Sequence, residues 1–112
     1  MKFKTGQEGD VTILTINGKI MGGPDHEKFH AEMKRLISEG RLKIVLDFGK
    51  VPWINSTGLG ILISGYASLK QAEGRMKISN VNERVLSLFY TAQLHDLFET
   101  YKTTEEAVQA FA

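Results

Sequence analysis

The hydrophobic positions of the chain follow two periods, one typical of β-strands and the other of α-helices. Apolar or alternating runs rich in β-branched residues predict five strands, at residues 2–5, 11–16, 43–48, 75–79 and 98–101. Apolar residues three or four positions apart predict four helices, around Phe29 to Ile37, Leu59 to Leu69, Val85 to Ala92 and Ala107 to Phe111. The predicted order of elements is therefore ββαβαβαβα.

This order predicts an α/β fold. Strands that alternate with helices form mostly parallel sheets, whereas the first two strands are close enough in sequence to pair as a hairpin. Residues 43–48 are apolar along nearly the whole run, which is typical of a central strand buried on both faces. Because no linker or internal repeat interrupts the chain, we expect one domain over residues 1–112, with a mixed, mostly parallel β-sheet and about four helices.

Composition and charge exclude several classes of function. The 112 residues are 42% hydrophobic and carry 14 basic against 13 acidic side chains, so no basic surface suited to nucleic acid is expected. There is no cysteine, and disulfides, zinc–thiolate sites and thiol nucleophiles are therefore impossible. No apolar run approaches the length of a membrane span or a signal peptide. We expect a soluble, cytoplasmic protein with no membrane partner.

One short motif matches a metal-site pattern. His26, Glu27 and His30 read H-E-x-x-H, which places two imidazoles one helical turn apart with a carboxylate as a possible base. A metal-dependent hydrolase is the remote alternative that this motif keeps open. Both histidines also flank the apolar face of the predicted helix, and a structural role is the favoured interpretation. Complete phosphate-binding, dinucleotide-binding and serine-hydrolase motifs are absent, so we expect neither a cofactor nor an enzyme.

A second motif lies where the central strand leads into the next helix. Asn55-Ser56-Thr57-Gly58 is a cluster of residues that favour helix starts. One interpretation is a simple helix cap, worth about 1 kcal/mol of stability. Another is a phosphoacceptor, because the free N–H groups and partial positive charge of a helix N-terminus favour a phosphate. The nearby Trp53 is expected to pack beneath this loop, and an exposed aromatic that contacts a partner is the alternative.

The segment from Val45 to Gly60 resembles the signature of the STAS domain (sulfate transporter and anti-sigma-factor antagonist), whose usual form is D-S-[ST]-G-L-G. The resemblance extends to the strand order, to the Asn17-Gly18-Lys19 turn and to residues 81–89. It is strongest toward stand-alone bacterial anti-sigma-factor antagonists, which have similar lengths. Two positions depart from the family pattern: Asn55 stands where an Asp is usual, and Met21 replaces an acidic residue of the loop after the second strand.

The resemblance implies a protein partner and a switch. It implies phosphorylation of Ser56 by a serine-kinase anti-sigma factor or related switch kinase, which ends binding, with a phosphatase as a further candidate partner. The implied partner-binding residues are Met21, Gly22, Gly23, Asn55, Ser56, Thr57, Gly58 and Leu59. A STAS scaffold or transporter-accessory subunit that is never phosphorylated remains the alternative within the same fold.

Overall fold

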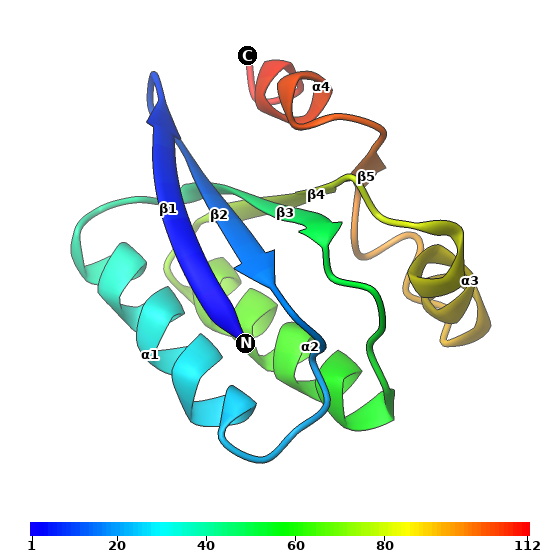
Figure 1. Ribbon diagram of the computed structural model, residues 1–112. Helices are drawn as coiled ribbons and strands as arrows, with labels where there is room; N and C mark the ends of the chain where they lie inside the picture. The colour runs from blue at the N-terminus through cyan, green and yellow to red at the C-terminus, as the bar shows by residue number, and fades with distance from the viewer.

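A computed structural model describes all residues from Met1 to Ala112 (Figure 1). Its elements follow the predicted order ββαβαβαβα and have these bounds: β1 Lys2–Glu8, β2 Val11–Asn17, α1 Asp25–Ser38, β3 Lys43–Lys50, α2 Ser56–Gln71, β4 Arg75–Ser79, α3 Glu83–Thr91, β5 Thr100–Tyr101 and α4 Thr104–Gln109. The longest helix, α2, has 16 residues, and none of the helices combines the length and apolar character that crossing a bilayer requires.

The five strands form one sheet in the order β1-β2-β3-β4-β5. The hairpin pair β1 and β2 is antiparallel, and the other three neighbouring pairs are parallel. The predicted mixed, mostly parallel sheet is therefore confirmed, with β3 at its centre. Strand β5 is shorter than the predicted 98–101, because the N–H of Phe98 bonds to the carbonyl of Leu94 and its ring packs 5.5 Å from that of Phe89.

The two faces of the sheet are covered unequally. On one face, α1 and α2 lie side by side (Figure 1), and α3 contributes Val85 and Phe89 to the same core of 20 buried residues. On the opposite face, α4 covers a smaller cluster in which Ala107 and Phe111 meet Val11 and Val45. The rest of that second face, toward the carboxyl ends of β2 and β3, carries polar side chains and no helix.

Three helices begin with a side chain that accepts a hydrogen bond from a free backbone N–H. Asn55, Asn82 and Thr103 are these N-cap residues of α2, α3 and α4, and each such cap contributes about 1 kcal/mol. The pattern Asn80-Val81-Asn82-Glu83 suggests a capping box that starts at Asn80, but the helix begins two residues later. Asn80 instead adopts a positive φ of 59° and its side chain bonds to Asp47, so it belongs to the turn.

Candidate functional site at the start of helix α2

The loops that follow β2 and β3 are joined to each other backbone to backbone. Ile20 and Ile54 form an isolated parallel bridge beyond the ends of the two strands. The N–H of Ile20 donates to the carbonyl of Trp53 at 3.3 Å, and the N–H of Asn55 donates to the carbonyl of Ile20 at 3.4 Å. Two segments more than 30 residues apart in the sequence, the Met21–Gly23 loop and the first turn of α2, therefore belong to one surface at the carboxyl ends of the strands.

Gly58 makes this close approach possible. A Cβ atom at Gly58 would lie 1.9 Å from the carbonyl oxygen of Ile20 and 2.7 Å from Cγ1 of Ile54, which no side chain could tolerate. The second glycine of the motif is different, because a Cβ at Gly60 would meet nothing within 4 Å. Gly22 has a positive φ of 113° and lies against the methyl group of Thr57, so a glycine is required there for its backbone conformation.

The backbone of Met21 is held from both sides. The side-chain amide of Asn55 donates to the Met21 carbonyl at 3.1 Å, while its oxygen accepts from the N–H of Gly58 at 2.8 Å. The carboxylate of Asp25 accepts from the N–H of Met21 at 3.3 Å. Asp25 is buried at the start of α1. The Met21 side chain is left outside, with 42% of its surface exposed.

Ser56 is the first residue of α2, and its exposed hydroxyl makes no side-chain hydrogen bond. Thr57 is also exposed, but its methyl group lies against Gly22. The first turn of α2 contains no acidic residue. Leu59, by contrast, is only 6% exposed and belongs to the core, and Gly58 is buried beneath the loop. The residues of the predicted site that reach solvent are Met21, Gly22, Gly23, Asn55, Ser56 and Thr57, which we call the α2-start surface.

Trp53 lies next to this surface and is half-buried. The guanidinium of Arg84, in the first turn of α3, stacks over its indole ring at 4.0 Å from the ring centroid, a cation–π contact that favours a defined ring position. The side-chain amide of Asn82 donates to the carbonyls of Val51 and Pro52 at 3.3 Å. The contact that covers the Trp53 ring is therefore a cation from α3, which the sequence did not predict.

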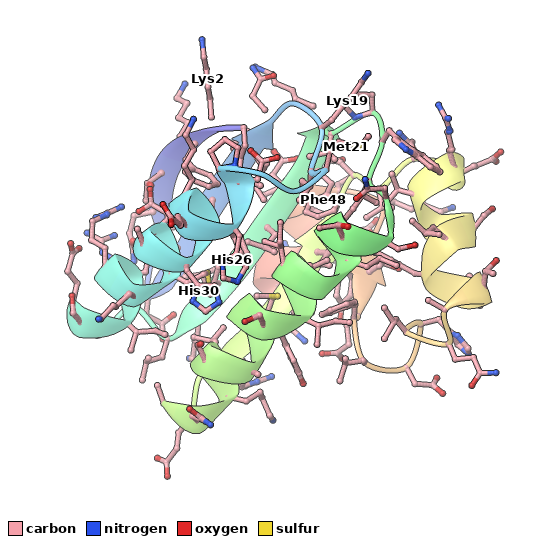
Figure 2. All side chains as sticks on the ribbon, turned by 90° about the horizontal axis from the view of Figure 1, so that it is seen from below. Lys2, Lys19, Met21, His26, His30 and Phe48 are labelled. Atoms are coloured by element: carbon pink, nitrogen blue, oxygen red, sulfur yellow. The ribbon has the colours of Figure 1, made fainter.

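The histidine motif lies elsewhere, between helices α1 and α2 (Figure 2). The rings of His26 and His30 are 4.8 Å apart, and Nε2 of His30 is 2.6 Å from the hydroxyl oxygen of Ser64 on α2. No three His, Cys, Asp or Glu side chains gather closely enough to form a metal centre. The observed partner of His30 is therefore a serine of the neighbouring helix, an arrangement that joins the two helices.

Comparison with known proteins places this architecture in a family. The model of the STAS domain matches residues 2–107. BtrV of Bordetella bronchiseptica, a proposed anti-sigma factor antagonist, is 23% identical over 99% of this chain and 95% of its own length. The anti-sigma-B factor antagonist of Bacillus subtilis is 32% identical over 53% of this chain and 54% of its own.

Solved structures agree with this assignment. The structure of a proposed anti-sigma factor antagonist from Thermotoga maritima superposes with a TM-score of 0.80 at 25% identity, covering 96% of this chain and 92% of that one. The phosphorylated form of the Bacillus protein SpoIIAA has the same fold, with a TM-score of 0.73 at 18% identity over 99% of this chain and all of that one. The matching family model, the ββαβαβαβα order and the Ser-Thr-Gly motif at the start of α2 together show that this chain belongs to the STAS domain family.

Proposed function

We propose that this STAS domain is an anti-sigma factor antagonist that binds a serine-kinase anti-sigma factor and is switched off by phosphorylation of Ser56. The observation that carries the proposal is the position of the Ser56 hydroxyl, exposed and unbonded as the first residue of α2. The two joined loops hold that residue on a fixed backbone. Curated relatives named as anti-sigma factor antagonists give the partner class.

A phosphate on Ser56 is compatible with the fold of the chain itself. It adds about −1.5 to −2 charges at neutral pH, next to the unpaired N–H groups and partial positive charge of a 16-residue helix. No carboxylate in the first turn of α2 opposes it. The charge instead lowers the affinity for the partner, because a partner that covers the α2-start surface must remove water from the phosphate. The chain acts as the substrate of its partner's chemistry and contributes no catalytic group.

One observation favours a STAS domain that works without phosphorylation, as a scaffold or transporter-accessory subunit. Both positions where the family usually has an acid near this surface, Met21 and Asn55, are uncharged here and bonded to each other. A kinase that recognises those acids would find neither. The modification of Ser56 distinguishes these two functions.

Phosphopeptide mapping separates them. The chain is incubated with ATP and the anti-sigma kinase encoded in its own genome, then digested and analysed by mass spectrometry. The proposal predicts one phosphate, on Ser56, and none in Ser56→Ala. The matched variant Thr57→Val, which keeps the methyl contact with Gly22, retains full phosphorylation. Phosphate on Thr57 in the unchanged chain, or no phosphate under conditions in which the kinase modifies another STAS substrate, would refute the switch.

A further inference from the structure

The face of the sheet that α4 leaves open carries a cluster of lysines. Lys2 on β1 and Lys50 on β3 flank Asn17 on β2 in a single row across the sheet. In the next row, Lys4 lies opposite Thr15. Lys2, Lys4, Thr15 and Asn17 share one face because residues two apart along a strand point the same way. A register shift between Thr15 and Asn17 places Lys50 opposite Asn17, and Lys50 lines the same hollow. Figure 1 shows α4 far from the N-terminal end of β1, where this cluster lies.

None of the three ammonium groups has a carboxylate partner. The salt bridges of the chain engage the Met1 amino group, Arg35, Arg41, Lys43, Lys77 and His95, and no Lys2, Lys4 or Lys50 pair is among them. Asp47 on β3 pairs with Thr15 on β2 and supplies the carboxylate in that row of the sheet. Its Oδ1 already accepts from the N–H of Gly49 at 2.9 Å and from the Asn80 amide at 3.0 Å. These neutral donors leave the charge of Asp47 in place, so three lysines face one carboxylate and the area keeps a net positive charge.

The lysines line a hollow together with neutral hydrogen-bonding groups. Its volume is about 130 Å³, and its lining residues are Lys2, Phe3, Lys4, Thr15, Asn17 and Lys50. The side chains of Thr15 and Asn17 make no hydrogen bond within the protein, so a hydroxyl and an amide are free to contact a bound group. Adjacent strands are about 4.8 Å apart, and Lys2 and Lys50 therefore approach the hollow from opposite sides of Asn17.

We propose that this hollow is a binding site for a phosphate oxyanion, supplied either by an inorganic phosphate or by the phosphate groups of a nucleotide. Lysine ammonium groups bind phosphate as point charges, and hydroxyl and amide donors complete the contact with its oxygens. A hollow of this volume holds several water molecules, which gives enough room for a tetrahedral oxyanion. The site is separate from Ser56 and does not depend on whether Ser56 is phosphorylated.

The test is an NMR titration of the isotopically labelled chain with pyrophosphate and, separately, with ADP, each against sodium chloride at matched ionic strength. The proposal predicts saturable amide shifts at Lys2, Lys4, Thr15, Asn17 and Lys50. Lys2→Gln and Lys50→Gln should each weaken binding by about tenfold, the loss expected for one hydrogen bond to a charged group. The control Lys34→Gln removes the same charge from an exposed position on α1 and leaves the affinity unchanged.

The two ligands identify the source of the phosphate. Tighter binding of ADP assigns the site to a nucleotide, and equal or tighter binding of pyrophosphate assigns it to inorganic phosphates. Amide shifts that do not saturate, or that spread over the surface as they do with chloride, would overturn the proposal. So would a loss of affinity in Lys34→Gln as large as that in Lys50→Gln.

Discussion

The amide of Asn55 donates to the carbonyl oxygen of Met21 at 3.1 Å, and these are the two positions at which the chain departs from the usual STAS pattern. A carboxylate at position 55 could still cap α2 by accepting from Gly58, but it has no proton to give to the Met21 carbonyl. The two departures therefore lie at the ends of one hydrogen bond. An Asn at position 55 replaces a negative charge near Ser56 with a contact that fixes the Met21 loop.

This pairing predicts a graded loss of stability at position 55. Asn55→Ala removes both the cap and the contact with Met21, and we expect a loss of about 2 kcal/mol in the free energy of unfolding. Asn55→Asp keeps the cap and should lose about half as much. Urea denaturation measures both. The control Thr103→Ala, whose side chain caps α4 with a single bond, should cost about 1 kcal/mol. Equal losses for Asn55→Ala and Thr103→Ala would show that the contact with Met21 contributes nothing.

The two glycines of the motif should respond in opposite directions to the same substitution. Gly58→Ala drives a methyl group into the Ile20 carbonyl, so the joined loops must separate, and we expect a loss of at least 3 kcal/mol or failure to fold. Gly60→Ala meets open space within the helix and should stabilise the chain by about 0.5–1 kcal/mol. Thermal denaturation of both variants is the measurement. A tolerated Gly58→Ala would contradict the close approach of the two loops.

The histidine pair should prove structural. His30→Ala removes the hydrogen bond to Ser64 between α1 and α2, and we expect a loss of about 1 kcal/mol in stability with unchanged partner affinity. Ser64→Ala should cost a similar amount, because it breaks the same bond from the other side. Chemical denaturation and elemental analysis of the purified protein check the two parts of this prediction. Stoichiometric zinc in the native chain that is lost in His30→Ala would favour the hydrolase alternative instead.

Trp53 offers a direct probe of the loop, because it is the only tryptophan of the chain. Arg84→Ala removes the guanidinium that covers its ring, and we expect a red shift of the fluorescence emission as water reaches the indole. The stability should fall by about 0.5–1 kcal/mol. Arg75→Ala, which leaves the Trp53 environment intact, serves as the control. An unchanged emission maximum in Arg84→Ala would show that the cation does not shield the ring.

The sequence predicted those parts of the fold that depend on local periodicity and on helix starts. The apolar run at 43–48 became the central strand β3, and the Asn55-Ser56-Thr57-Gly58 cluster begins α2. Prediction was wrong where a tertiary contact overrides the local pattern. Phe98 reads as part of a strand but is drawn into the aromatic core beside Phe89. The N-cap of α3 is Asn82 and not Asn80, and the Asn82 side chain also bonds to the loop after β3.

The sequence motif predicted the position of the candidate site, but it did not predict the contacts that support the site. Ser56 and Thr57 are recognisable from their position after a buried strand. The Asn55 amide bonds to Met21, which is more than 30 residues away. Asp25 accepts from the backbone N–H of Met21, which depends on the conformation of the loop before α1. The lysine cluster is likewise invisible in the sequence, because Lys2 and Lys50 meet only through the register of three strands.

The central claim is that a negative charge at Ser56 disrupts partner binding without disturbing the fold. Asn55 supplies the cap of α2, so Ser56→Ala and Ser56→Asp should both stay within about 1 kcal/mol of native stability. Calorimetric titration of the two variants against the anti-sigma factor tests the claim most directly. We expect near-native affinity for Ser56→Ala and at least a 100-fold loss for Ser56→Asp, which corresponds to roughly 3 kcal/mol. Equal affinities of the two variants would contradict it.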